Sequence, residues 1–170
     1  MKFSSKEMLE IAGAATVIAS VAFVGLQLKL DRDVALADSF SDGIESRKDD
    51  IRSKMESDTF MLMQQALWEA GVRPAWWSTV LENSESKHLA SGAQIMARFY
   101  EVDLDYLELE RIHFRYNQGL IDQDYWNGAK ATLKSFLTEP FRRAVFLSRG
   151  SRLSETVNEL IEEIDNANGT

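Results

Sequence analysis

The chain has 170 residues, enough for one domain and an appendage, and its two prolines, nine glycines and 45% apolar content favour helices over a turn-rich all-β fold. It has no cysteine, which excludes disulfides, thiol catalysis and zinc-thiolate sites. Its net charge of −8 argues against nucleic acid as a partner.

The first predicted element is a membrane-spanning helix, whose 18 uncharged residues begin at Ile11 and end at Leu28. At a rise of 1.5 Å per residue they cover about 27 Å, close to the hydrocarbon thickness of a bilayer. Small residues recur in it every four positions, a spacing that lets membrane helices associate; they are Ala12, Thr16 and Ser20, and Ala15 and Ala19. We expect residues 1–30 to form a short tail and an uncleaved transmembrane helix that contacts lipid through residues 11–28.

Two other interpretations of this segment remain. A cleaved signal peptide would have Lys2 and Lys6 as its basic region and residues 35–37 (Ala-Leu-Ala) as its cleavage site. Against it, charged residues lie between the apolar run and that site; they are Lys29, Asp31, Arg32 and Asp33. A buried core helix of a soluble protein is the other alternative, favoured by the small residues.

The positions of lysine and arginine predict the orientation of the span. Lys2 and Lys6 precede it, and four basic residues follow it within about twenty positions; these four are Lys29, Arg32, Arg47 and Lys48. The excess predicts that the domain lies in the cytoplasm and the N-terminal tail outside. We expect the membrane to be a bacterial inner membrane.

Apolar or small residues then recur at spacings of four and three through residues 31–56, which predicts a helical extension or stalk; they are Leu30, Val34, Ala37, Ser41, Ile44, Lys48, Ile51 and Met55. We favour packing of this seam on the domain over a coiled coil between subunits.

Residues 57–166 are predicted to form a helical bundle, followed by a disordered tail at residues 167–170. Its first helix starts at Ser57 or Asp58 and stops at Gly71. Pro74 opens a short helix, on which Trp76 and Trp77 are candidates for membrane-interface contact; its other apolar residues are Val80 and Leu81.

Further helices are expected over about residues 86–118, from Asp122 to about Phe136, from Thr138 and Pro140 to about Gly150, and over about residues 153–164. No strand-like alternation appears. The sequence therefore predicts an all-α protein in which an N-terminal transmembrane helix continues into a bundle of about five to six further helices.

The residues from Arg115 to Trp126 resemble a pattern in uncharacterised bacterial proteins, in which an aromatic residue, Gly-Leu, an aliphatic residue, Asp and then Trp join two helices. Those proteins also have a Pro and an Arg further along the chain, which correspond to Pro140 and Arg143 here. Their apolar N-terminal helix is followed by a Gln and a basic residue, which correspond to Gln27 and Lys29. The resemblance implies an N-terminal membrane helix and a small all-helical domain, without implying any activity.

The same segment predicts a helix connection. Gly119 would end the helix in a left-handed conformation, and Asp122 would cap the next helix. Leu120 and Ile121 would fill the core between them, where Trp126 would face them. The alternative is a pocket around Tyr116, Trp126 and Arg115.

Both histidines lie in Glu-x-x-His motifs, Glu85 with His88 and Glu110 with His113, the spacing that di-iron bundles use. On one helix the two pairs would lie nearly 40 Å apart, so we predict no metal site and no cofactor, with Glu110 and His113 as the only metal candidates. Asp103 is assigned, with Glu101, Asp105 and Glu108, to the solvent-exposed face.

No phosphate-binding glycine loop and no nucleophile elbow is present, which favours a binding role over catalysis. An acidic run directly follows the one basic cluster, so we expect the basic residues to pair within the chain. The basic residues are Arg142, Arg143, Arg149 and Arg152, and the acidic residues are Glu155, Glu159, Glu162 and Glu163. The function expected is a membrane-anchored protein-interaction or scaffolding module, with an unknown protein or its own copy as partner. The alternative is a ligand- or metal-binding bundle that uses Glu110, His113, Tyr116 and Trp126.

Overall fold

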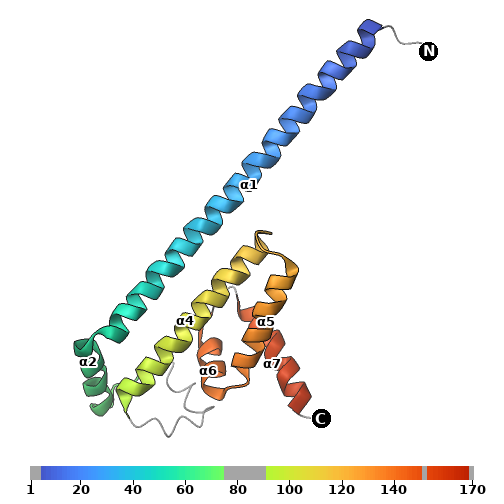
Figure 1. The fold of residues 1–170 in the computed structure, drawn as a ribbon. Helices are drawn as coiled ribbons and strands as arrows, with labels where there is room; N and C mark the ends of the chain where they lie inside the picture. Colours follow the sequence, from blue (N-terminus) through green and yellow to red (C-terminus); the bar gives the residue numbers. More distant parts are fainter. Residues whose placement is uncertain (1–4, 75–90, 151–152, 169–170) are drawn as a thin grey trace. The chain divides into compact units, whose positions relative to one another are not determined.

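The computed structural model describes residues 5–74, 91–150 and 153–168. Over these residues the regular structure consists of six helices without a strand, which confirms the all-α fold (Figure 1). The helices are α1 (Ser5–Glu56), α2 (Asp58–Glu69), α4 (Gly92–Asn117), α5 (Gln123–Leu137), α6 (Pro140–Ser148) and α7 (Ser154–Asn168). The expected short helix with Trp76, Trp77, Val80 and Leu81, and the pair Glu85 and His88, lie outside the described residues.

The chain divides into two compact units, Met1–Ser39 and Phe40–Thr170. The described part of the first unit is helix alone, from Ser5 onward, and α1 continues through the boundary to Glu56. The second unit contains the last turns of α1 and the helices α2 to α7, and it holds both clusters of buried side chains described below.

The part of α1 inside the second unit packs on α4. Ile44 and Ile51 are buried against Leu107, which is fully buried. The rings of Phe40 and Phe114 lie 4.2 Å apart between centroids. From Ile44 onward, therefore, apolar residues of the seam pack on α4.

The larger core lies among α4, α5, α6 and α7, each of which contacts at least two of the others. It is built from apolar residues at helical spacing, because such residues share one helix face. Its largest fully buried side chains are Val102, Leu133, Leu137, Val145, Phe146, Leu153 and Val157.

Side-chain caps fix where α2 and α4 begin. Ser57 accepts a hydrogen bond from the Phe60 amide at 3.2 Å, and Ser91 accepts one from the Gln94 amide at 3.2 Å. Because Ser91 is extended, α4 starts at Gly92 and the expectation of one helix over residues 86–118 is wrong at its start. A Cβ at Gly92 would meet the Cβ of Trp68 at 2.3 Å, so the glycine lets α2 approach α4 closely.

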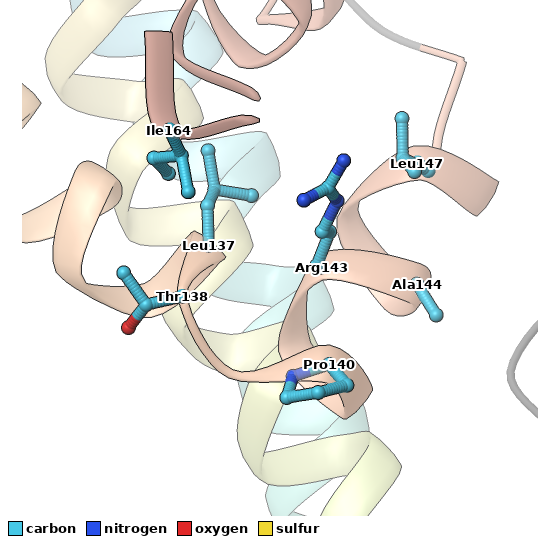
Figure 2. Close-up of a pocket in the computed structure, with 7 residues that line it drawn as sticks. All are labelled: Leu137, Thr138, Pro140, Arg143, Ala144, Leu147 and Ile164. Atoms are coloured by element: carbon cyan, nitrogen blue, oxygen red, sulfur yellow. The ribbon is translucent and has the colours of Figure 1, made fainter. Parts of the chain in front are cut away.

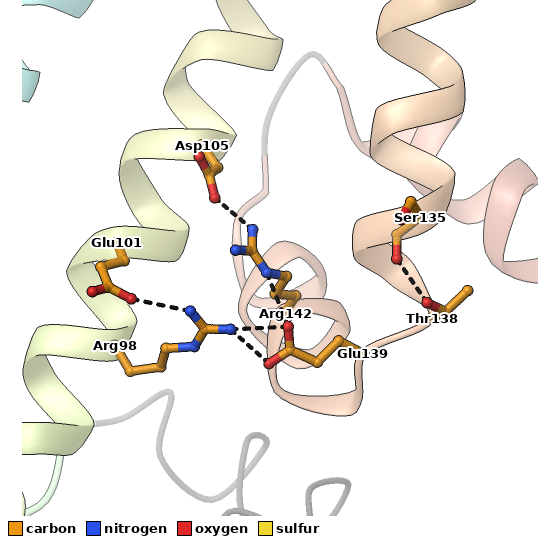
Figure 3. Close-up of polar contacts among 7 residues, drawn as sticks. All are labelled: Arg98, Glu101, Asp105, Ser135, Thr138, Glu139 and Arg142. Carbon is orange, nitrogen blue, oxygen red and sulfur yellow. Dashed lines mark hydrogen bonds and ion pairs between the residues drawn. The ribbon is translucent and has the colours of Figure 1, made fainter.

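Two helix ends in the C-terminal half also differ from expectation. Thr138 does not open α6: it is the C-cap residue of α5 and donates a hydrogen bond to the Ser135 carbonyl, and Glu139 precedes Pro140 at the start of α6 (Figure 3). α7 continues to Asn168 rather than ending near Ile164, so residues 167 and 168 of the expected tail are helical. An ion pair between Arg143 and Asp165 stabilises this additional turn.

Candidate functional site

The apolar segment of α1 is uncovered. Of the described residues, only this helix is long and apolar enough to cross a membrane, and none of its most apolar 18-residue window is buried inside the protein. Its large side chains are 52% to 70% exposed between Val17 and Leu28; they are Val17, Ile18, Val21, Phe23, Val24, Leu26 and Leu28. A soluble protein rarely leaves so large a continuous apolar surface in water.

Two hydroxyl groups in this segment bond to their own helix. Thr16 Oγ1 donates to the Ala12 carbonyl at 2.8 Å, and Ser20 Oγ donates to the Thr16 carbonyl at 2.8 Å. An unsatisfied polar group in hydrocarbon costs several kcal/mol. Because both hydroxyl donors are satisfied locally, Thr16 and Ser20 impose no such penalty on membrane insertion.

The connection between α4 and α5 is built from local backbone chemistry. Gly119 has φ of +70°, and its amide and the Leu120 amide donate to the carbonyls of Tyr116 and Arg115, a Schellman motif. Asp122 Oδ1 then accepts a hydrogen bond from the Tyr125 amide at 2.8 Å and caps α5. Leu120 is only half-buried, as is Ile121, and neither belongs to the main core.

Gly119→Ala is expected to lower the free energy of unfolding by about 1 kcal/mol, because a Cβ is disfavoured in the left-handed conformation. No atom lies within 4 Å of a Cβ built at this glycine, so the cost is one of backbone conformation and not of a clash. Urea unfolding of the full chain in detergent measures the change. Gly128→Ala is the control, because it lies within α5 with equally open space and alanine favours a helix.

The structure brings the rings of His113, Tyr116 and Trp126 together, with Tyr116 stacked on Trp126 and His113 tilted to it. The Tyr116 and Trp126 rings are 5.4 Å apart at 17°, and His113 lies 5.1 Å from Trp126. Trp126 is 5% exposed and belongs to the main core. Through these ring contacts, His113 and Tyr116 of α4 pack against Trp126 of α5. The Nε atom of Arg115, the third residue of the expected pocket, is buried without a hydrogen bond to the described residues.

Glu110 and His113, the two metal candidates, occupy neighbouring turns of α4. Glu110 is buried, and burial lowers the pKa of His113, an effect that Glu155 opposes. His113 Nε2 lies 3.2 Å from Asn117 Nδ2, and its Nδ1 has no hydrogen-bond partner among the described residues. No group of three or more histidine or acidic side chains converges within the described part of the chain.

Asp103 forms a buried ion pair that the sequence did not indicate. The expectation that Asp103 lies on the solvent-exposed face is wrong: Asp103 is 5% exposed, and its Oδ2 lies 2.6 Å from Arg149 Nη2. The Arg149 guanidinium also lies 5.1 Å from the Phe99 ring. Burial raises the pKa of Asp103, and the positive charges of Arg149 and Arg47 oppose this. Arg149 therefore favours the ionised form of this buried carboxylate.

Arg149→Met is expected to lower the free energy of unfolding at pH 7 by about 2 to 3 kcal/mol, because it leaves a buried carboxylate unpaired. The loss is smaller than for a fully buried pair because the Arg149 side chain is 29% exposed. Without Arg149 the folded-state pKa of Asp103 lies further above its unfolded value, so the loss shrinks as pH falls toward 4 and the carboxylate takes up a proton.

Urea unfolding at several pH values between 4 and 7 measures this effect. Adding Asp103→Asn to Arg149→Met should restore most of the stability lost at pH 7. A loss that is independent of pH, or that the double variant does not relieve, would show that the Arg149 side chain contributes through packing alone.

The other described arginines of the basic cluster also pair within the chain, but not with the acidic run that follows them. Arg142 binds Asp105 and Glu139, and Glu139 also receives two hydrogen bonds of 3.0 Å from Arg98, which joins α4 to the start of α6 (Figure 3). Arg143 binds Asp165 through two bonds of 2.7 Å. Asp105 and Asp165 come from other helices, whereas Glu139 is the N-cap residue of the helix that carries Arg142. Arg152 lies outside the described residues.

A pocket of about 330 Å³ opens between α5, α6 and α7. Its lining is apolar apart from a hydroxyl and a guanidinium, and Figure 2 shows Arg143 reaching up between Leu137 and Leu147. The same guanidinium is held by Asp165. The lining residues are Leu137, Thr138, Pro140, Arg143, Ala144, Leu147 and Ile164. The pocket lies on helices other than α4, which carries Glu110 and His113.

The chain has no significant match to a protein-family model, to a curated protein or to a solved structure.

Proposed function

We propose that this protein is a single-pass membrane protein that holds an acidic helical bundle at the membrane, where the bundle binds a protein partner. The observation that carries the anchor is the apolar segment of α1, none of which is covered by the rest of the protein. Lipid is the environment in which such a segment is stable, since its backbone groups bond within the helix and its side chains are apolar.

Two features favour an anchor over the alternative interpretations. A signal peptide would be cut after Ala37, but four charged residues between Lys29 and Asp33 separate the apolar run from this site. A core helix would be buried, and the apolar window of α1 is not.

The proposed topology places the bundle in the cytoplasm of a bacterial cell, with the anchor in the inner membrane. Lysine and arginine near the span are more numerous on its C-terminal side, the side that remains cytoplasmic under the positive-inside rule. The resemblance of the segment ending at Trp126 to bacterial proteins supports the bacterial setting.

The binding role rests on the surface of the bundle. α2 has no buried residue, although it carries six large apolar side chains, and three of them are exposed. Exposed apolar surface of this kind marks interaction sites.

The alternative function is ligand or metal binding at Glu110 and His113. It is supported by the buried Nδ1 of His113, which has no hydrogen-bond partner among the described residues. Transition-metal analysis of the purified protein and of His113→Ala tests that alternative, since only a bound metal that the variant loses would favour it.

Carbonate extraction of membranes followed by intact-mass measurement tests the anchor. We expect the protein to stay with the membrane pellet and to have the mass of the full chain of 170 residues, apart from removal of the initiator methionine. A product that starts after Ala37 would establish a signal peptide instead. Recovery of the full chain in the carbonate supernatant would overturn the anchor itself.

A further inference from the structure

One side of α2 is apolar and uncovered. Leu62, Met63 and Leu67 are 70%, 47% and 39% exposed, and Ala66 and Ala70 are exposed beside them. At about 100° per residue these five positions share one side of the helix. They are called the α2 face below.

The opposite side of α2 is already occupied by the bundle. Met61 and Trp68 pack against the main core, and the Phe60 ring lies 6.1 Å from Tyr100 of α4. Gln65 Oε1 accepts a hydrogen bond from the Ala93 amide at 3.1 Å. α2 is therefore held in place by one side, which leaves the α2 face available in a fixed orientation.

Acidic residues border the α2 face along one edge. Asp58, Leu62 and Glu69 are spaced by four and seven residues, so they lie in one row, with the two carboxylates about 16 Å apart at its ends. Gln65 Nε2 donates to Glu69 Oε1 at 2.7 Å and orients this carboxylate. α2 contains no basic residue, and nearby Arg73 lies 3.8 Å from the Trp68 ring on the opposite side of the helix.

We propose that the α2 face is the docking surface for a basic amphipathic helix of a partner protein. This inference rests on the proposed binding function and specifies its surface and its partner. An apolar face of this width takes the apolar side of a helix at spacings of three and four, and the unbranched Met63 adapts to an irregular partner. The acidic edge selects lysine or arginine about three turns apart on that partner, opposite Asp58 and Glu69.

Charge argues against a second copy as the occupant. Each copy carries a net charge of −8, and two α2 faces in contact would bring four carboxylates together. Like charges in opposed positions across an interface suppress association. A partner of opposite charge has no such penalty.

The test uses the full chain in nanodiscs of zwitterionic lipid and a fluorescent synthetic peptide. The peptide is an 18-residue amphipathic helix of leucine and alanine with two lysines eleven positions apart, and a matched peptide has glutamate in place of both lysines. Fluorescence anisotropy should show binding of the basic peptide, weakened roughly tenfold or more by Leu62→Ala, since this substitution removes most of the apolar side chain that the peptide would bury. Asp58→Lys combined with Glu69→Lys should reverse the preference toward the acidic peptide.

Leu147→Ala is the matched control, because this leucine is 46% exposed on another helix. The inference is overturned if the basic peptide does not bind, if Leu147→Ala weakens binding as much as Leu62→Ala does, or if the charge-reversed chain keeps the original preference. Failure of peptide binding by a chain that resists carbonate extraction rejects this docking surface and leaves the membrane anchor standing.

The other occupants are tested with Leu62→Cys, which is informative because the chain has no cysteine of its own. Ready labelling of this thiol by a maleimide in nanodiscs is expected. Disulfide-linked dimers formed in native membranes would assign the α2 face to a second copy. Resistance to labelling in the solubilised full chain would show that the chain itself covers the face, and either result would overturn the inference.

Discussion

Replacing Ile18 and Val21 together with arginine is expected to release the protein from carbonate-washed membranes. Both residues lie near the middle of the apolar segment and are 70% and 67% exposed. Arginine at the centre of a membrane helix costs about 2.5 to 3.5 kcal/mol on insertion scales, and each replacement also removes a favourable aliphatic side chain. The double replacement therefore costs about 6 kcal/mol. About half of the segment is alanine, glycine, serine or threonine, so the span has little apolar excess to offset this cost.

The matched control introduces the same two charges beyond the charged residues that end the span. Val34→Arg with Leu36→Arg changes exposed residues of the same helix, 39% and 46% accessible, and should leave the protein in the membrane pellet. If the substitutions at Ile18 and Val21 leave the protein in the pellet as well, the attachment does not depend on this segment. If both double variants are released, the attachment depends on the charge of α1 as a whole.

The apolar segment could be recognised from sequence because its signal is continuous and local. A run of eighteen uncharged residues can be recognised without any knowledge of the rest of the fold. The sequence could not show that the rest of the chain leaves Val17 to Leu28 uncovered, since burial depends on contacts between distant residues. This exposure is what the structure adds, and it separates a membrane segment from a core helix of the same composition.

Helix ends were predictable where a capping residue decides them. The stop at Gly119 and the start at Asp122 follow from a glycine C-cap and an aspartate N-cap. The start of α4 was missed although the sequence carries a signal for it: Ser91 and Gln94 have the spacing of a capping box. The reason Gly92 is required is not local, because the atom that excludes a side chain there belongs to Trp68 of α2.

Long-range pairing limits what the sequence reveals about the candidate sites. Arg149 and Asp103 are 46 positions apart, and nothing near either residue indicates its partner. The acidic run after the basic cluster suggested local pairing, whereas Arg143 and Arg142 bind carboxylates on other helices. In contrast, Tyr116 and Trp126 are near neighbours across one tight turn, so their proximity was predictable, and only the stacked geometry was not.

Phe146→Ala is expected to lower the free energy of unfolding of the bundle by about 3 to 5 kcal/mol, the usual cost of truncating a buried phenylalanine. Phe146 is 1% exposed in the main core, and its ring meets Tyr106 edge-on at 5.0 Å between centroids. Its loss removes apolar burial, opens a cavity, and removes an aromatic contact of about 0.5 to 1.5 kcal/mol. Urea unfolding of the full chain in detergent, followed by circular dichroism, measures the change.

Leu147→Ala is the control for this substitution, because the neighbouring side chain is 46% exposed and a surface truncation changes stability by about 0.5 kcal/mol. Phe146→Ala should nevertheless remain in the carbonate-washed pellet, since the apolar segment of α1 contributes no residue to the core that Phe146 occupies. Equal destabilisation by the two variants would place Phe146 outside the stabilising core. Release of Phe146→Ala from the membrane would show that anchorage requires the folded bundle, and the anchor would then have to be assigned to more of the chain than residues 11–28.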